Sequence, residues 1–256
     1  MGEDRVGKGR RRANVVKQQR AQSTKQFYLA LLVVAIIGGL LIWRTAGKTN
    51  SRIVATNVKA TPAQAEGYLM GNPNAPVQIM EFADFECPAC GQFATITEPD
   101  VRKRIVETGL ASYRFFDFPL TEIHKNTLAA SNAAACAADQ GKFWEMHDQL
   151  YMHQPEWSTE ATSNPKKFFE RYAGQIGLDV GTWSKCYDDE PHLQRIMSNR
   201  AEGERRNVRQ TPTFVIGTKM IPGSLSYDMI KAYVDTAAAQ VARNAVSADS
   251  GVKGGK

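Results

Sequence analysis

The feature that most constrains the fold of this chain is the sequence EFADFECPACGQF at residues 81–93. The apolar run at 77–82 has the length and the flanking turn residues of a buried strand. A helix is expected to start directly after Cys87, because Pro88 suits the first helical position, where its missing N–H has no intrahelical partner. Two of the four cysteines, Cys87 and Cys90, are therefore expected where a buried strand meets the start of a helix.

The start of a helix changes the chemistry of a cysteine placed there. The free backbone N–H groups of Ala89 and Cys90, which follow Pro88, point towards the Cys87 sulfur, and the positive end of the helix dipole favours a thiolate. In Cys-x-x-Cys sites of this kind the thiol pKa falls from about 8.5 to roughly 3.5–7. We therefore predict that Cys87 is the nucleophile of a thiol–disulfide exchange reaction. Cys90, one turn further on and more buried, is predicted to be the resolving thiol.

Two other interpretations of the Cys-Pro-Ala-Cys sequence stay open. The pair can be half of a zinc site, whose other half would have to come from Cys136 and Cys186 in predicted helices. The pair can also be a purely structural bridge. A Cys-x-x-Cys between a strand and a helix, outside the cytosol, favours redox chemistry, so no metal is expected.

The N-terminal region predicts a membrane anchor. Residues 1–25 alone carry a charge of +6, which equals the net charge of the whole chain. The uncharged run at 27–43 follows, and about 17–25 apolar residues span a bilayer. A cleaved signal peptide is the alternative, but its apolar region is usually about 7–15 residues long. The excess of basic residues before the run predicts a cytoplasmic tail at 1–26, with the rest of the chain in the periplasm or outside the cell.

The rest of the chain is predicted to be one folded domain with short polar flanks. Beyond residue 25, basic and acidic side chains are equal in number, which argues against a nucleic-acid-binding surface. We expect a tether at 44–66, the domain at 67–243 and a flexible tail at 244–256. Within the domain, predicted helices form a block at about 123–207.

The order of the predicted elements indicates an α/β fold. A helix is expected over 88–107, kinked at Pro99, and a strand over 111–118 follows it. A strand, a helix and a strand in this order suggest a βαβ unit with parallel strands. The later sequence TPTFVIGTKMIPG is typical of a β-hairpin that turns at 217–218, and 226–243 are predicted to form a final amphipathic helix.

Four segments together resemble the thioredoxin superfamily and, within it, the DsbA-like branch. They are APVQIMEFADFECPACGQF, YRFFDFPL, ACAADQGKFWEMHDQLY and TPTFVIG, and the likeness extends over about residues 67–240. In that branch a helical block interrupts the thioredoxin fold. The resemblance implies a thioredoxin-like α/β fold with an inserted helical block, preceded here by one transmembrane helix. It also implies a protein thiol–disulfide oxidoreductase that needs no cofactor.

The resemblance assigns roles to individual residues. Pro212 matches the cis-proline that faces the redox pair, and Thr211 before it would offer backbone groups to an extended substrate. Glu81 lies where relatives carry a buried carboxylate under the second cysteine, so it would accept the proton of Cys90. The alternative for Glu81 is an acid at the rim of the site without a role.

The remaining polar residues near the motif have simpler expectations. Asp84 and Glu86 are expected to be exposed, and Glu86 to disfavour the neighbouring thiolate somewhat. His124 is expected to be a polar residue at a helix start, with a place near the site as the alternative. Cys136 and Cys186 make the number of cysteines even, which favours a structural disulfide; free thiols or a second redox relay are the alternatives.

Ala89 departs from the DsbA-like pattern, because strongly oxidising relatives commonly carry His at this position. Alanine gives a backbone N–H but no side chain to support the thiolate, and a less stabilised reduced state makes the pair less oxidising. We expect an oxidase that acts on secreted or periplasmic proteins and is reoxidised by a membrane redox partner. An isomerase or reductase of the same fold, or a tethered peptide-binding module, is the alternative.

Overall fold

The computed structural model describes residues 29–38 and 58–252, with side chains up to residue 247. The chain divides into two units, Met1–Asn50 and Ser51–Lys256. In the first unit, the described residues are helical and expose leucine, isoleucine and valine side chains.

The predicted membrane anchor at 27–43 lies only partly within the described residues. The predicted tail at 1–26 lies outside them, and so does the tether from 44 to 57. Among the residues that the structure describes, no helix combines the length and the apolar character needed to cross a membrane.

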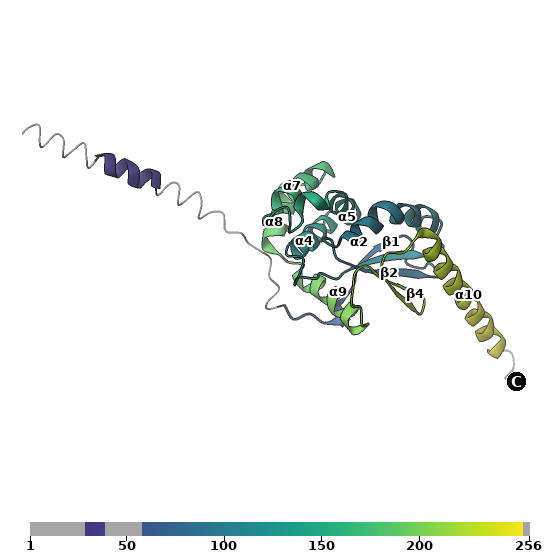
Figure 1. Ribbon diagram of the computed structural model, residues 1–256. Helices are drawn as coiled ribbons and strands as arrows, with labels where there is room; N and C mark the ends of the chain where they lie inside the picture. The colour runs from purple at the N-terminus through teal and green to yellow at the C-terminus, as the bar shows by residue number, and fades with distance from the viewer. Residues whose placement is uncertain (1–28, 39–57, 253–256) are drawn as a thin grey trace, which may run out of the picture. The chain divides into compact units, whose positions relative to one another are not determined.

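The second unit consists of a five-stranded sheet and the helices packed around it (Figure 1). The strands are β1 (Tyr68–Met70), β2 (Gln78–Ala83), β3 (Ser112–Asp117), β4 (Thr213–Ile216) and β5 (Lys219–Pro222). The α-helices are α2 (Pro88–Gln92), α3 (Glu98–Val101), α4 (Thr127–Ala138), α5 (Phe143–Met152), α6 (Gln154–Trp157), α7 (Lys166–Gln175), α8 (Val180–Asp189), α9 (Leu193–Arg205) and α10 (Tyr227–Val252). Shorter helical segments are η1 (Pro62–Gln64), η2 (Phe93–Thr97) and η3 (Arg102–Val106).

The strand order β1-β3-β2-β4-β5 places β2 at the centre of the sheet. β2 and β3 are parallel and are joined by the helical segments α2 to η3, which confirms the predicted βαβ unit. The other neighbouring pairs are antiparallel, including the predicted hairpin of β4 and β5. The chain that leaves the C-terminal end of β2 reaches Cys87 after three residues. The central strand thus positions the redox motif.

The two faces of the sheet contribute to different cores, because side chains along a strand alternate between faces. Ile79 of β2 packs in one cluster with Phe93 of η2, below the helix that carries the redox motif. Phe82 and Phe116 belong to a separate cluster that faces the other way. Glu81 is two residues from Ile79 and therefore points to the face of the redox helix.

The helical insertion covers the redox motif from one side. Helices α4 to α9 occupy Thr127 to Arg205, inside the block predicted at 123–207. Cys90 lies in the same buried cluster as Leu150 and Trp157 of the insertion. The insertion therefore helps to shield the second cysteine from solvent.

The structure changes three details of the expected secondary structure. The short strand β1 was not predicted, because three residues give too little pattern and its pairing partner, β3, lies more than forty residues later. The redox helix is interrupted by π-helical segments on both sides of α3, which contains Pro99 at its start; proline has no N–H for the regular helical bond. The final helix continues to Val252, which corrects the expected flexible tail from 244, because this alanine-containing sequence sustains a helix.

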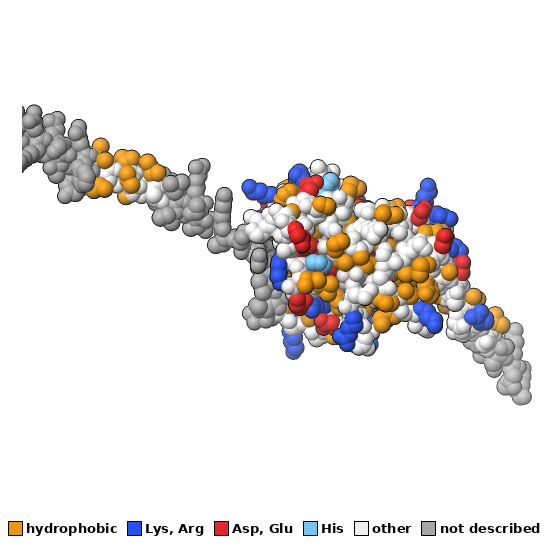
Figure 2. Space-filling view, viewed as in Figure 1, with side chains coloured by type: hydrophobic (Ala, Val, Ile, Leu, Met, Phe, Trp, Pro, Cys, Tyr) orange, Lys and Arg blue, Asp and Glu red, His pale blue; other side chains and the backbone are white. Residues whose placement is uncertain are grey.

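The surface of the second unit mixes both signs of charge. On the face shown in Figure 2, Lys and Arg side chains alternate with Asp and Glu side chains around apolar areas. This face has no large patch of a single sign, in agreement with the balanced composition beyond residue 25.

Candidate active site

Cys87 occupies the N-cap position of α2, and Pro88 is the first helical residue, as expected from the sequence. The backbone of Cys87 is extended and not helical, so the Cys87 side chain stands at the start of the helix. Cys87 is 7% exposed and Cys90 is fully buried, and both are thiols in this structure. The first cysteine is therefore the one that a second protein can reach.

The environment of Cys87 favours the thiolate. Its pKa is lowered from 9.0 to about 6, and the largest cause is the hydrogen bond with the Cys90 thiol. The side chain of Thr211 and the backbone N–H groups of Cys90 and Ala89 lower the pKa further, against the opposing effect of burial. At neutral pH most Cys87 side chains are therefore ionised.

Cys90 is in the opposite situation. Burial raises its pKa well above 9.0, and the hydrogen bond with Cys87 and the charges of Cys87 and Glu81 raise it further. At neutral pH Cys90 is therefore a thiol, and it needs a proton acceptor before it can act as a nucleophile.

Glu81 lies buried on β2, where Tyr113 of β3 donates a hydrogen bond to its carboxylate. Burial raises the pKa of Glu81 well above the ordinary 4.5, and the nearby charge of Glu98 raises it further. The hydrogen bond from Tyr113 acts in the opposite direction. The charges of Glu81 and of the cysteine pair influence one another, so the carboxyl group is close enough to matter for their protonation.

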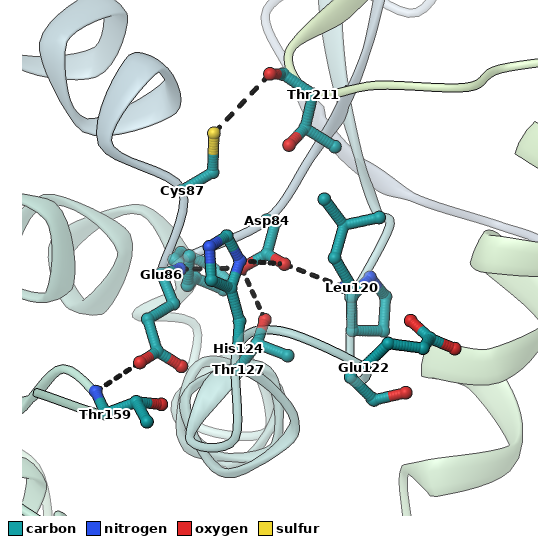
Figure 3. A network of polar contacts seen from close by, with 12 residues as sticks. Asp84, Glu86, Cys87, Leu120, Glu122, His124, Thr127, Thr159 and Thr211 are labelled. Carbon is teal, nitrogen blue, oxygen red and sulfur yellow. Dashed lines mark hydrogen bonds and ion pairs between the residues drawn. The ribbon is translucent and has the colours of Figure 1, made fainter.

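Thr211 and Pro212 face the cysteine pair from the start of β4. The peptide bond between them is cis, as the resemblance implied. The Cys87 thiol donates a hydrogen bond to the Thr211 carbonyl oxygen, 3.4 Å from the sulfur (Figure 3). The Thr211 hydroxyl is buried and has no partner among the described residues while Cys87 is a thiol that donates to the backbone; a Cys87 thiolate can accept from this hydroxyl, which is how the Thr211 side chain lowers the thiol pKa. This loop thus presents polar backbone groups beside the reactive sulfur.

Asp84 and Glu86 are buried, so the expectation that they are exposed was wrong. The Asp84 carboxylate accepts hydrogen bonds from the N–H of Glu86, at 2.7 Å, and from the Thr127 hydroxyl, at 2.6 Å. The Glu86 carboxylate accepts from the N–H groups of Asn126, at 2.9 Å, and Thr159. Both acids therefore bind the loops around the motif instead of pointing to solvent.

His124 lies in the loop before α4 and forms an ion pair with Asp84, with 2.8 Å between the imidazole Nδ1 and a carboxylate oxygen (Figure 3). Asp84 raises the pKa of His124, chiefly through this hydrogen bond, and the charges of Glu86 and Cys87 add to the rise. His124 thus lies near the site, which was the alternative expectation from the sequence.

Two further residues of the insertion contact the motif, and sequence reasoning missed both. The Gln154 amide donates hydrogen bonds to the carbonyl oxygens of Phe85, at 2.7 Å, and Cys87, at 3.1 Å. The Tyr151 hydroxyl donates to the Asp84 carbonyl oxygen at 3.3 Å. Their sequence separation of more than 65 residues from the motif leaves no local signal for these contacts.

The other two cysteines, Cys136 of α4 and Cys186 of α8, are joined by a disulfide bond. The alternative of a zinc site built from all four cysteines therefore does not apply to this form of the protein. The disulfide lies within the insertion and connects two of its helices.

A cysteine pair at a helix start, opposite a cis-proline and on a sheet interrupted by helices, defines a thioredoxin-like dithiol protein. The family model described as Thioredoxin matches residues 63–236, so the chain belongs to the thioredoxin family. Its fold is shared with the crystal structure of alpha-DsbA1 of Wolbachia pipientis, which superposes with a TM-score of 0.62 at 19% identity, over 70% of this chain and 94% of that chain.

Two curated relatives add different information. The disulfide bond formation protein D of Bacillus subtilis is 23% identical over 167 residues, which cover 65% of this chain and 75% of the relative. The Na(+)/H(+) antiporter NhaA 3 of Salinispora tropica is 35% identical over 170 residues, or 66% of this chain. The matched part is only 24% of the antiporter, so the chain spans about a quarter of that relative.

Proposed function

We propose that this protein is a thiol–disulfide oxidoreductase that introduces disulfide bonds into secreted or periplasmic proteins. The observation that carries the proposal is the contrast between the two cysteines. Cys87 is 7% exposed and has a pKa of about 6, whereas Cys90 is fully buried and has a raised pKa. A reactive outer thiol with a protected inner thiol is the arrangement that exchange through a mixed disulfide requires.

In the first step a substrate thiolate attacks Cys87 in the oxidised pair. The Cys87–Cys90 bond breaks, a bond between Cys87 and the substrate sulfur forms, and Cys90 leaves with the electron pair. Because the Cys90 thiolate is disfavoured by burial, it needs a proton at this moment. Glu81, whose pKa is raised, holds a proton more readily than an exposed glutamate and is the proposed donor.

In the second step another substrate thiolate attacks the substrate sulfur of the mixed disulfide. The substrate gains its disulfide, and Cys87 leaves as a thiolate. Its low pKa makes it a good leaving group. The pair has then accepted two electrons. Reoxidation runs in the reverse sense: Glu81 takes the proton of Cys90 as that thiol attacks a mixed disulfide formed with an oxidant.

Thr211 and Pro212 are proposed to bind the substrate chain. The loop is next to Cys87, and an extended peptide can pair with its backbone as an added strand. This would hold the substrate sulfur in line with Cys87 during both steps.

The pKa of Cys87 also bears on the direction of electron flow. A value of about 6 lies between the value of about 7 for thioredoxin and about 3.5 for strongly oxidising DsbA. An isomerase or reductase of the same fold is therefore the second candidate function. Ala89 supports the Cys87 sulfur only through its backbone N–H, in keeping with this intermediate value.

The place proposed for the protein is the cytoplasmic membrane, with residues 27–43 as a single span and the thioredoxin domain outside. Support comes from the uncharged run and the basic residues before it. A membrane redox partner would reoxidise the pair. Ion transport is not proposed, because the chain matches only a quarter of the antiporter.

Protease treatment of intact spheroplasts tests the proposed orientation in the membrane. The protease should digest the thioredoxin domain and spare the tail at 1–26; the reverse pattern would exclude this orientation.

The reduction potential of the Cys87–Cys90 pair tests the proposed function. The protein is equilibrated in glutathione buffers, and the alkylated thiols are counted by mass. A potential near −120 to −180 mV supports an oxidase or isomerase, and one near about −270 mV supports a reductase. A pair that does not titrate would exclude the enzyme and leave a peptide-binding module. Cys87→Ser is the control, and it should abolish exchange.

A further inference from the structure

A second group of chemically reactive side chains lies around the disulfide of the insertion. It comes from the C-terminal end of α4 and the residue after it, the C-terminal half of α8 and the residue before α9. We name it the Cys–His–Asp cluster; its members are Cys136, Asp139, Cys186 and His192. The proposed redox mechanism uses none of them.

Two members of the cluster, His192 and Cys186, contact one carboxylate oxygen of Asp139. The Asp139 Oδ2 atom lies 2.8 Å from His192 Nε2 and 3.5 Å from the Cys186 sulfur. A disulfide sulfur has no proton to donate, so the second distance is a contact of two electron-rich atoms and not a hydrogen bond. The two sulfur atoms and a ring nitrogen of His192 all lie within 4.8 Å of one another. Three potential ligand atoms thus lie close together, and the Asp139 carboxylate contacts two of the residues that carry them.

The backbone places these side chains as a metal site requires. Asp139 directly follows α4 with a helical backbone conformation and is three residues from Cys136, so the two side chains project from the same side. The Cα atoms of Cys136 and Cys186 are 5.8 Å apart. Ligand atoms bound at about 2.0–2.3 Å to a tetrahedral ion lie roughly 3.3–3.8 Å from one another. For the two sulfur atoms and the His192 nitrogen, which lie within 4.8 Å of one another, side-chain shifts of about 1–2 Å would therefore give that geometry once the sulfur atoms are no longer bonded.

The exposure of the cluster allows a cation to reach it. Cys136 is buried, while the side chains of His192 and Asp139 are 20% and 51% exposed. The cluster is therefore anchored on its protein side and open on its solvent side.

We propose that reduction of the Cys136–Cys186 disulfide converts the Cys–His–Asp cluster into a binding site for Zn²⁺. Two thiolates, an imidazole and a carboxylate are ligands that zinc accepts in four-coordinate sites. The same set is poorly suited to Mg²⁺ or Ca²⁺, which prefer oxygen ligands alone. The oxidised form has no thiolates and does not form the site.

The electrons and protons of this conversion balance. A dithiol or a phosphine supplies two electrons, the sulfur–sulfur bond breaks, and two thiols form with two protons from water while the reductant is oxidised. Zn²⁺ then replaces the two thiol protons, which are released to solvent, and two zinc–sulfur bonds form. His192 binds through Nε2 as a neutral imidazole, and Asp139 binds as a carboxylate. Bound zinc holds the thiolates apart and so protects them from oxidation.

The test uses the full chain with Cys87→Ser and Cys90→Ser, so that the redox pair cannot bind metal. The protein is reduced with a phosphine, freed of metal, and titrated anaerobically with Zn²⁺ against a chromophoric chelator, and separately with Co²⁺. We expect one Zn²⁺ per reduced chain, at least 100-fold weaker binding to the oxidised chain, and a thiolate-to-cobalt absorption band. Equal binding by both forms, or a cobalt spectrum without that band, would overturn the proposal.

Two variants test the ligands that are not sulfur. His192→Gln and Asp139→Asn should each weaken Zn²⁺ binding at least tenfold. His153→Gln is the matched control, because His153 forms a similar ion pair with Glu156 and lies outside the cluster. It should bind Zn²⁺ with the same affinity as the chain without this substitution. Unchanged affinity in His192→Gln would contradict the proposal.

A further readout needs no variant of the cluster. Zn²⁺ should slow the alkylation of Cys136 and Cys186 in the reduced parent at least tenfold, and it should slow the return of their disulfide under diamide. Alkylation at the same rate with and without Zn²⁺ would contradict the proposal, even if a variant of the cluster failed to fold.

Discussion

The sulfur of Cys87 lies 3.4 Å from the carbonyl oxygen of Thr211, although 124 residues separate the two in sequence. The contact joins the end of the central strand to the loop before β4. Thr211 also contributes to the acidity of Cys87, since its side chain is one of the groups that lower the thiol pKa. One residue can thus bind the substrate backbone and tune the nucleophile.

Thr211→Val should raise the pKa of Cys87, because valine has nearly the same shape but no hydroxyl to stabilise the thiolate. The thiolate absorbance in the ultraviolet, followed with pH in the reduced protein, gives the pKa directly. Thr213→Val is the control: the Thr213 hydroxyl donates to the Gln210 carbonyl oxygen at 2.8 Å and does not serve Cys87. A titration of Thr211→Val that coincides with the parent would refute this role.

The stability of the reduced protein should increase between pH 5.5 and pH 7.5. The pKa of Cys87 is lowered from 9.0 to about 6 on folding, so the unfolded chain holds the proton in this range and the folded one releases it. This adds about 2 kcal/mol to the free energy of unfolding, and it is lost as the pH falls through 6. Urea unfolding at several pH values measures it.

Two controls isolate the contribution of Cys87 to this pH dependence. Cys87→Ser has no thiol at this position, and the oxidised protein has no free thiol there. Both should lack the increase of about 2 kcal/mol, whatever other groups titrate in the same range. The same increase in all three proteins would assign it to another residue.

Glu81→Gln should slow the attack of Cys90 on a mixed disulfide by about 100-fold, because the amide cannot accept the thiol proton. Stopped-flow release of a fluorescent peptide from Cys87 measures this step. The parent rate should rise with pH through the raised pKa of Glu81. A rate in Glu81→Gln equal to that of the parent would favour the alternative of an acid without a role.

Replacing two neighbours of Glu81 should shift the pKa of Glu81 in opposite directions. Tyr113→Phe removes a hydrogen bond that lowers the pKa of Glu81, so the pH midpoint of the resolving step should move up. Glu98→Gln removes a charge that raises it, so the midpoint should move down. Both variants are judged by the midpoint and not by the rate. Shifts in the same direction would mean that another group controls the step.

The elements around the redox motif could be predicted because their signals are local. An apolar run marks β2, Pro88 marks the start of α2, and Gly217, with a φ of +58°, marks the hairpin turn. The burial of Asp84 and Glu86 could not be predicted in this way. Their charges are stabilised by hydrogen-bond donors that come more than thirty residues later, from the insertion and the loop before it.

The roles of the two cysteines could also be predicted, because they depend on the local sequence. Position relative to the helix start decides which sulfur receives the free N–H groups, and the sequence contains that position. The contribution of Thr211 to the thiol pKa is different, because it depends on a loop placed by the pairing of β2 with β4. The resemblance to a family placed Pro212 opposite the redox pair, but the contact of Thr211 with Cys87 and its effect on the thiol pKa were not predicted.

Asp84→Asn should destabilise the protein by about 2–4 kcal/mol, because a buried carboxylate accepts four hydrogen bonds here and an amide can accept fewer. It should also lower the pKa of His124, which Asp84 raises. The ion pair stabilises the fold below the ordinary histidine pKa of about 6.5, and this contribution is lost as the pH rises through the raised value. Nuclear magnetic resonance of the His124 ring and urea unfolding test both effects.

The ion pair of Glu156 with His153 is the matched control for the Asp84 variant. It joins the same kinds of charged group at 2.9 Å, but both side chains are partly exposed. Glu156→Gln should therefore change the unfolding free energy little, since exposed ion pairs contribute little to stability. A comparable loss in both variants would show that burial of Asp84 is not the reason for the effect.

The disulfide between Cys136 and Cys186 should contribute about 2–4 kcal/mol to stability, because it closes a loop of about 50 residues in the unfolded chain. Replacing both residues by alanine in a chain without the redox pair should lower the unfolding free energy by this amount under oxidising conditions. Adding a phosphine and a chelator to the parent should lower it similarly, and Zn²⁺ without the chelator should restore part of the loss. A parent whose stability is the same with and without the phosphine would show that the disulfide does not hold the insertion together.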